Sequence, residues 1–193
     1  MTDVKRTQAD RRANTQRELI WAARKLFAEK GYAATSTPEI AAAAGVTRGA
    51  LYHHYADKMA LFLAVVEQEH TMLSMAVQGA TAGDEPGPVK ALIAAGDAFI
   101  DAMQDEGRRR ILLVDAPAVF GRDTLDAIDA RHGLKTLIEA VRVAISAKAI
   151  RDVPALPLAH LLNALFHRAA LAPAEELANY RKTIKALIRG LKS

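Results

Sequence analysis

The sequence contains no cysteine and few aromatic residues, and each absence narrows the classes of protein to which it can belong. Without cysteine in 193 residues, disulfide bonds, thiolate catalysis and cysteine-based metal sites are excluded. Aromatic residues make up 5% of the chain, and no segment alternates apolar and polar residues in the way that strands do. Alanine, leucine, lysine, arginine and glutamate recur throughout, and all of them favour helices. The composition therefore predicts an all-α fold.

Long apolar segments are also missing. No apolar run approaches the roughly 18 residues that are needed to span a bilayer. The N-terminal segment, residues 1–16, is polar and has no apolar stretch of the kind found in secretory signals. We therefore expect a soluble, cytoplasmic protein without a membrane partner.

Motifs for catalysis and metal binding are not recognisable in the sequence. There is no glycine-rich phosphate loop and no nucleophile elbow. His53 and His54 are adjacent, so on a helix they point about 100° apart and cannot chelate one metal ion together. His160 and His167 are seven residues apart and are expected in a core or an interface. We expect a protein that is not an enzyme and that has neither cofactor nor metal.

The positive charge is concentrated in the N-terminal part of the chain. Residues 1–55 hold nine lysines and arginines against five acidic residues, whereas the remaining residues hold 17 of each. The whole formal net charge of +4 therefore lies in the first 55 residues. This distribution favours a contact between that segment and nucleic-acid phosphates, although a solvated charged face is the simpler alternative.

Two short helices in series are predicted between residues 37 and 55. Thr37 is expected to cap the first helix, with Pro38 in the first turn, where a missing N–H does no harm. Gly45 is expected to end that helix, and Thr47 to cap the second one. Two helices joined by a short turn that contains glycine form a helix-turn-helix, whose second helix can enter the major groove of DNA. A plain helical hairpin with a polar face is the alternative.

The second of these helices is expected to present a polar face with the chemistry of DNA recognition. The outward residues are Thr47, Arg48, Gly49, Tyr52 and His53. Arginine can bind guanine edges through two hydrogen bonds, threonine and histidine can bind bases or phosphates, and glycine allows a close backbone approach. This face therefore predicts contacts in or beside the groove.

A longer part of the chain resembles the DNA-binding domain of the TetR family of transcriptional regulators. The resemblance is carried by residues 17–32, 35–41, 44–52 and 55–61, with their spaced glycines, aromatic residues and a lysine. It implies that Lys58, in the first turn of the next helix, contacts the DNA backbone. We assign Thr35, Thr37 and Lys58 to phosphates, and Thr47, Arg48, Tyr52 and His53 to the groove or its edges.

The helical pattern predicts about nine helices in two domains. The first domain covers residues 1–56, with a basic arm over residues 1–12 and a helix from about residue 12 to residue 30. The second domain covers residues 57–193, with a loop at 81–88, an irregular or kinked connection around Pro117 and one long helix from Asp123 to about Ala149. Pro154 and Pro157 are expected to open the penultimate helix.

The last two helices carry long apolar faces, one of which could be satisfied within the chain for each helix. Residues 158–166 of the penultimate helix are apolar over more than half of the helix circumference, which suggests contacts on two sides. The TetR resemblance implies that such a pair forms a four-helix interface with a second subunit, and a bundle closed within one chain is the alternative. The expected interface residues are Leu158, Leu161, Leu162, Leu165, Phe166, Tyr180, Ile184 and Leu187.

The middle helices are expected to hold a small molecule, since the resemblance implies that this region binds effectors. Flexible or bulky apolar residues are the candidate lining, because ligand pockets are mostly apolar with a few polar anchors. These are Met72, Met75, Phe99, Met103, Leu112 and Phe120. The polar candidates are Asp115, Arg131 and His132, for each of which a surface charge or an internally bonded group is the simpler interpretation.

The functional hypothesis is a ligand-responsive, dimeric transcriptional regulator that acts as a repressor. Its expected partners are double-stranded DNA with a palindromic operator, a small-molecule effector and a second copy of the chain. The alternative is a helical binding protein, or a regulator that acts through a protein partner, without a direct use of DNA.

Overall fold

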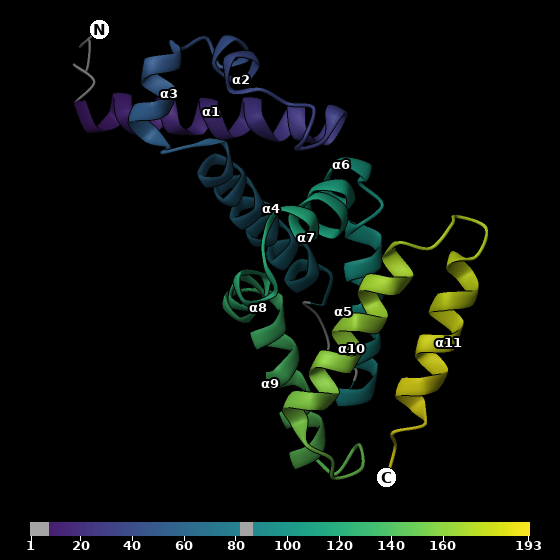
Figure 1. Cartoon of the computed structure of the whole chain (residues 1–193). Helices are drawn as coiled ribbons and strands as arrows, with labels where there is room; N and C mark the ends of the chain where they lie inside the picture. Colours follow the sequence, from purple (N-terminus) through teal and green to yellow (C-terminus); the bar gives the residue numbers. More distant parts are fainter. Residues whose placement is uncertain (1–7, 82–86) are drawn as a thin grey trace, which may run out of the picture. The chain divides into compact units, whose positions relative to one another are not determined.

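The structure is a computed structural model that describes residues 8–81 and 87–193 (Figure 1). Within these ranges the fold contains helices and no strand, which confirms the all-α prediction. The helices are α1 Gln8–Lys30, α2 Thr37–Ala43, α3 Arg48–His54, α4 Lys58–Thr81, α5 Pro88–Ala102, α6 Glu106–Arg110, a π-helical segment η1 Ile111–Asp115, α7 Ala116–Val119, α8 Arg122–Arg131, α9 Gly133–Ser146, α10 Ala155–Ala170 and α11 Leu177–Arg189. No helix in these two ranges is long and apolar enough to cross a membrane.

The chain divides into two compact units, and the division falls within α4, between Gln68 and Glu69. The expected boundary at residue 56 lies earlier, at the point where α4 begins. The difference arises because the first turns of α4 bury Leu61, Phe62 and Val65 in the N-terminal unit. Residues 1–7 of the predicted basic arm and residues 82–86 of the predicted loop lie outside the described ranges, and residues 8–12 belong to α1.

Aromatic contacts form the centre of the N-terminal unit. Phe27, on the buried side of α1, lies 4.9 Å from Phe62 of α4, measured between ring centroids. Tyr32 lies 4.8 Å from the same Phe62 ring. Gly31 ends α1 with a φ of 84°, a conformation that glycine adopts without strain. This turn directs Tyr32 back onto the ring cluster.

The helix-turn-helix of α2 and α3 is present, with one correction to its start. Ser36, and not Thr37, caps α2: the Ser36 hydroxyl accepts from the Glu39 backbone N–H, and the Glu39 carboxylate accepts from the Ser36 N–H. This reciprocal pair of hydrogen bonds is a capping box. It is more favourable than a cap by Thr37 alone, because it satisfies two backbone N–H donors at the start of the helix instead of one. Gly45, with a φ of 66°, follows α2, and Thr47 caps α3 as predicted.

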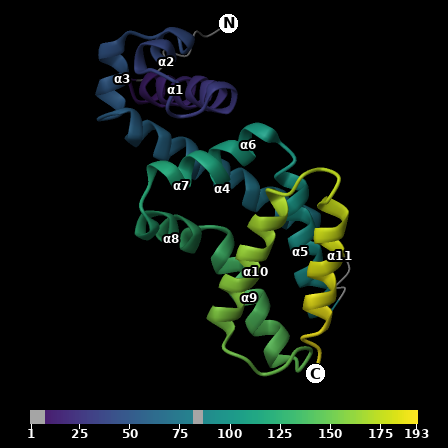
Figure 2. The ribbon, with the colours of Figure 1, turned by 45° about the vertical axis from the view of Figure 1, so that its right-hand side comes forward.

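Four helices enclose the core of the C-terminal unit. Helix α10 packs against α9, α5 and α11, and α11 also packs against α5 (Figures 1 and 2). Buried aliphatic residues from α5 and α9, such as Leu92 and Val141, meet Leu162 and Phe166 of α10 and Ile188 of α11. Helix α10 is therefore surrounded by three neighbours, and both α10 and α11 keep exposed residues, among them Leu161 and Leu187.

Two predictions about the middle of the chain are to be compared with the structure. The connection around Pro117, expected to be irregular or kinked, is helical with a π turn directly before it: the Ala116 N–H bonds to the carbonyl of Ile111, five residues back. The expected long helix over 123–149 is divided at His132, whose φ and ψ of −115° and −119° are not helical. Helix α9 starts directly afterwards at Gly133.

Candidate nucleic-acid interface and ligand pocket

Helix α3 presents the predicted polar face. Leu51 and the following Tyr55 are buried beneath it, and this fixes the rotation of the helix. The side chains of Thr47, Arg48, Tyr52 and His53 are all exposed, and so is Gly49. Thr47 accepts the Ala50 N–H at 3.1 Å, so its hydroxyl hydrogen is still available to an acceptor.

Tyr52 joins the two helices of the motif. Its hydroxyl lies 3.1 Å from the Thr37 hydroxyl of α2, and the Arg48 guanidinium lies 5.4 Å from the centre of its ring. The pKa of Tyr52 is lowered, first by the hydrogen bond with Thr37 and then by Arg48. Thr37, which is half-buried, and the exposed Arg48 and Tyr52 thus form one group of side chains whose members orient one another.

The structure assigns a different place to Thr35. Its side chain is 2% exposed, and its hydroxyl donates to the Gly31 carbonyl at 2.8 Å. A buried hydroxyl with an internal partner cannot hold a phosphate, so the prediction for this side chain was wrong. The reason is local, because Thr35 closes the turn that follows α1.

Lys58 also supports this turn. Its ammonium donates to the Tyr32 carbonyl at 2.9 Å and to the Thr35 carbonyl at 3.0 Å, and it lies 4.1 Å from the centre of the Tyr32 ring. An ammonium group has three N–H donors, so two serve the turn and the geometry leaves one for another acceptor. A phosphate contact by Lys58 stays a prediction, and the residue has a structural role besides.

A second basic area lies where the start of α1 meets the end of α3. Arg11 and Arg12 of α1 and His53 and His54 of α3 line one shallow surface depression. The pKa of His54 is lowered, mainly by burial and further by His53 and Arg12. The two arginines were predicted only as part of a basic arm, because their position beside α3 depends on the packing of α1.

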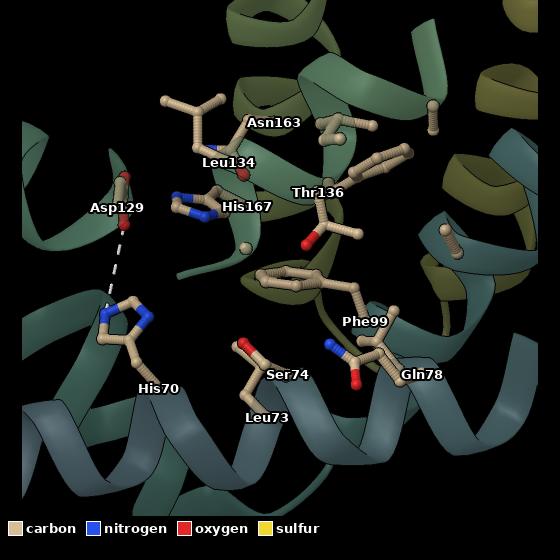
Figure 3. A pocket seen from close by; sticks show the side chains of 16 residues that line it. His70, Leu73, Ser74, Gln78, Phe99, Asp129, Leu134, Thr136, Asn163 and His167 are labelled. Carbon is tan, nitrogen blue, oxygen red and sulfur yellow. Dashed lines mark ion pairs between the residues drawn. The ribbon is translucent and has the colours of Figure 1, made fainter. Parts of the chain in front are cut away.

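The C-terminal unit contains a cavity of about 100 Å³ (Figure 3). It lies among α4, α5, α8, α9 and α10, all on the C-terminal side of the division within α4. Its lining consists of His70, Leu73, Ser74, Val77, Gln78, Ala95, Phe99, Asp129, Gly133, Leu134, Thr136, Leu137, Ala140, Asn163, Phe166 and His167. Most of these side chains are apolar, as is usual for sites that bind small molecules.

A carboxylate and two imidazoles give the cavity its polar character. His70 Nε2 lies 4.0 Å from Asp129 Oδ1, and the His70 ring stacks on His132 at 5.3 Å between centroids. Burial raises the pKa of Asp129, with a smaller contribution from Asp126, while a hydrogen bond from Asn163 opposes the rise. Burial lowers the pKa of His167 to about 4, so this ring is neutral at neutral pH.

A ring stack and a buried hydroxyl also belong to this cavity. The His167 ring stacks on Phe99 at 5.2 Å between centroids, with 12° between the ring planes. The Ser74 hydroxyl is buried and has no hydrogen-bond partner within the described parts of the chain. A buried hydroxyl without a partner is unfavourable, so this atom is a candidate anchor for a ligand.

Of the nine predicted pocket residues, Phe99 alone belongs to the cavity lining that the structure describes. Met72 and Met75 are 50% and 64% exposed, because the face of α4 that is turned toward the cavity carries Leu73 and Val77 instead. The others also lie elsewhere. Met103, Leu112 and Phe120 are buried outside the cavity, Asp115 pairs with Arg110 at 3.8 Å, Arg131 is exposed, and His132 stacks behind His70.

The predicted interface residues divide into two groups. Leu162, Phe166 and Ile184 are buried in the core of the C-terminal unit, so their assignment to an interface was wrong. Leu161 and Leu187 are 65% and 51% exposed, so they leave apolar surface uncovered. Leu158, Leu165 and Tyr180 are half-buried against the core.

Comparison with known proteins agrees with both halves of this arrangement. Residues 19–65 match the bacterial regulatory proteins of the tetR family, and residues 89–192 match the tetracyclin repressor-like C-terminal domain. This chain belongs to the TetR family. It is accordingly a DNA-binding transcriptional regulator with an N-terminal helix-turn-helix domain and a C-terminal helical domain.

Individual relatives cover the chain to different extents. The Transposon Tn10 TetC protein of Escherichia coli is 28% identical over 188 residues, which are 96% of this chain and 94% of that protein. A crystal structure of a TetR-family regulator from Pectobacterium atrosepticum is 30% identical and has a TM-score of 0.79, over 97% of this chain and 98% of its own. The regulator CymR of Pseudomonas putida is 46% identical over 67 residues, 35% of this chain and 33% of that protein.

Proposed function

We propose that this TetR-family protein is a ligand-responsive repressor that binds a palindromic operator as a dimer and releases it when a small molecule occupies the cavity. The observation that carries the proposal is that α4 belongs partly to the N-terminal unit and partly to the C-terminal unit. Leu61 and Phe62, near its start, are buried in the N-terminal unit, whereas Leu73 and Val77 line the cavity. One continuous helix therefore supplies side chains to both units.

DNA recognition rests on the face of α3. Arg48 is exposed and oriented by Tyr52, which suits a guanidinium that reads a guanine edge through two hydrogen bonds. Tyr52, Thr47 and His53 lie on the same face and supply further contacts to bases or phosphates. Arg11 and Arg12 add positive charge beside α3 for the DNA backbone.

Dimer formation rests on the exposed sides of α10 and α11. Leu161 of α10 and Leu187 of α11 are among the exposed leucines of these two helices, and a two-fold contact would cover both. Two-fold symmetry places two recognition helices about 34–36 Å apart, one turn of the DNA helix, and so matches a palindromic site. The dimer therefore accounts for the uncovered apolar surface and for the symmetry of the operator.

Release of the operator requires a ligand that favours one conformation of α4 over another. His70, Ser74 and Gln78 also face the cavity from α4, so a ligand that bonds to them stabilises one position of this helix. A coupling free energy of about 1–3 kcal/mol is typical between two sites and changes affinity by about 5- to 150-fold. An effect of this size is sufficient for a switch between bound and released states.

Substitution of Arg48 tests the assignment of the reading face. Arg48→Ala should remove the preference for one base pair in each half-site, a loss of about 1–3 kcal/mol of discrimination. Binding to the operator and to single-base variants is measured by fluorescence anisotropy over a range of salt concentrations. Arg151→Ala is the matched control, because it removes the same charge from an exposed position of the C-terminal unit.

The control should leave the base preference unchanged. An equal loss for Arg48→Ala on every sequence would show that Arg48 contacts only the backbone and would contradict its role. No specific binding by the wild-type protein would favour the alternative, a regulator that acts through a protein partner.

A further inference from the structure

The cavity in the C-terminal unit has a carboxylate at one end and an aromatic ring at the other. In the view of Figure 3, Asp129 and His70 lie at one end, Phe99 lies at the other beside Thr136 and Gln78, and His167 lies between the two ends. The Phe99 and His167 rings stack on each other, and Leu73, Leu134 and Leu137 add aliphatic surface. Stacked rings and aliphatic side chains favour a flat apolar group in the ligand.

The charge of the lining is one-sided. Among the described residues that line the cavity, Asp129 is the one acidic side chain, and lysine and arginine are absent. His167 is neutral at neutral pH, since burial lowers its pKa to about 4. His70 faces Asp129 at 4.0 Å, so any positive charge on this imidazole is already opposed by the carboxylate. A ligand anion would therefore lose its hydration without gaining a cationic partner.

Hydrogen-bonding groups are nevertheless available to a ligand. The Asp129 carboxylate accepts a hydrogen bond from Asn163 and can accept more, since each oxygen has two lone pairs. The Ser74 hydroxyl has no partner in the described structure, and the Gln78 amide and Thr136 hydroxyl also line the cavity. A ligand with one donor group can satisfy Asp129 while its apolar part covers the rings.

We propose that the cavity binds a small single-ring molecule that carries no negative charge and that donates a hydrogen bond, from an amine or an alcohol, to the Asp129 carboxylate. The size of a single-ring molecule suits this cavity, because its volume of about 100 Å³ is small for a ligand site. This inference rests on the proposed function, in which the cavity is the effector site, and it adds the chemical class of the effector.

Three probes with the same ring test the class directly: benzylamine, benzyl alcohol and benzoate. Binding to the full-length protein without DNA is measured by isothermal titration calorimetry at pH 7. Benzylamine and benzyl alcohol should bind, and benzoate should bind at least about tenfold more weakly, because a hydrogen bond to a charged group corresponds to about 10- to 100-fold in affinity. Benzoate binding as tightly as benzylamine, or no binding of any probe at millimolar concentration, would overturn the proposal.

Substitution of the carboxylate locates the effect. Asp129→Asn keeps the shape of the side chain. It should weaken the binding of benzylamine about tenfold or more, and it should reduce the difference in affinity between benzylamine and benzoate. Asp123→Asn is the matched control, since it removes an exposed carboxylate from the same helix and should leave the ranking unchanged. An equal effect of both substitutions would show a general charge effect and contradict a contact at Asp129. If Asp129→Asn does not fold, the ranking of the three probes on the wild-type protein decides alone.

Operator binding is measured separately, so the two proposals can fail separately. Probes that bind with the expected ranking without weakening operator binding would contradict the ligand-responsive function and leave the ligand class intact. An operator that is bound specifically, together with tight benzoate binding, would contradict the ligand class alone.

Discussion

Replacement of Gly96 by alanine should destabilise the protein, although alanine is the better helix former. Gly96 is buried within α5, and a Cβ atom at this position would lie 2.4 Å from Cε1 and 2.7 Å from Cζ of Phe166. Both distances are shorter than a carbon–carbon contact allows, so the Phe166 ring must move. The ring is 3% exposed and belongs to the core that joins α5, α9 and α10.

The expected magnitude follows from two opposing effects. Overpacking of a core costs about 1–3 kcal/mol, and a glycine-to-alanine change within a helix returns about 0.5–1 kcal/mol. The two ranges leave a net loss between about 0 and 2.5 kcal/mol. We expect about 0.5–2 kcal/mol, because the overlap with the ring is severe but Phe166 also lines the cavity and can move partly into it. For a protein of this size, this loss lowers the melting temperature by about 1–8 °C.

The assay is thermal and urea unfolding of Gly96→Ala beside two other variants. Gly79→Ala is the matched control: Gly79 also lies in a helix, and a Cβ at this position would meet no atom within 4 Å. This control should be as stable as the wild type or up to about 1 kcal/mol more stable. The pair Gly96→Ala and Phe166→Leu should lose less together than the sum of the two single losses. Gly96→Ala at or above wild-type stability would refute the reasoning.

Three further predictions concern stability. Ser36→Ala removes the capping box with Glu39 and should cost about 1 kcal/mol, measured by urea unfolding, and an unchanged midpoint would contradict the cap. The buried Glu69 carboxylate lies 2.8 Å from the Arg108 guanidinium, and Arg108→Met removes this partner. The substitution should lower the free energy of unfolding by about 3–5 kcal/mol in the same assay, and a loss below about 1 kcal/mol would contradict a buried ion pair. The pKa of His167 is lowered in the folded state to about 4, so between pH 6.5 and pH 4 the unfolded chain binds the extra proton. Stability should therefore fall by about 1–3 kcal/mol as the pH decreases through this range, and His167→Gln should reduce the fall; identical pH profiles for the two proteins would contradict the assignment.

Local signals in the sequence predicted the helix-turn-helix closely. Gly45 and Thr47 act within a few residues of themselves, so the turn and the second cap follow from sequence alone. The first cap was misplaced by one residue because Ser36 and Thr37 are both good capping residues. The partnership of Ser36 with Glu39 decides between them, and its spacing is visible in the sequence.

The cavity was not predictable in the same way. Its lining comes from five helices, and a helical pattern shows which residues share a face but not which other helix that face meets. Phe99 was predicted for its size, whereas His167 and Asn163 were not considered as lining, although both are polar residues within an apolar helix. The same limit applies to Phe166, which the pattern placed on an apolar face without showing that this face is satisfied within the chain.

The most direct test of the proposed function is selection of bound sequences from a random pool of DNA duplexes, with the purified full-length protein at near-physiological salt. The account predicts a palindromic consensus with half-sites centred about 10 base pairs, or a multiple of this, apart. Weak binding without sequence preference, both in the absence of ligand and in the presence of a metabolite mixture, would contradict it.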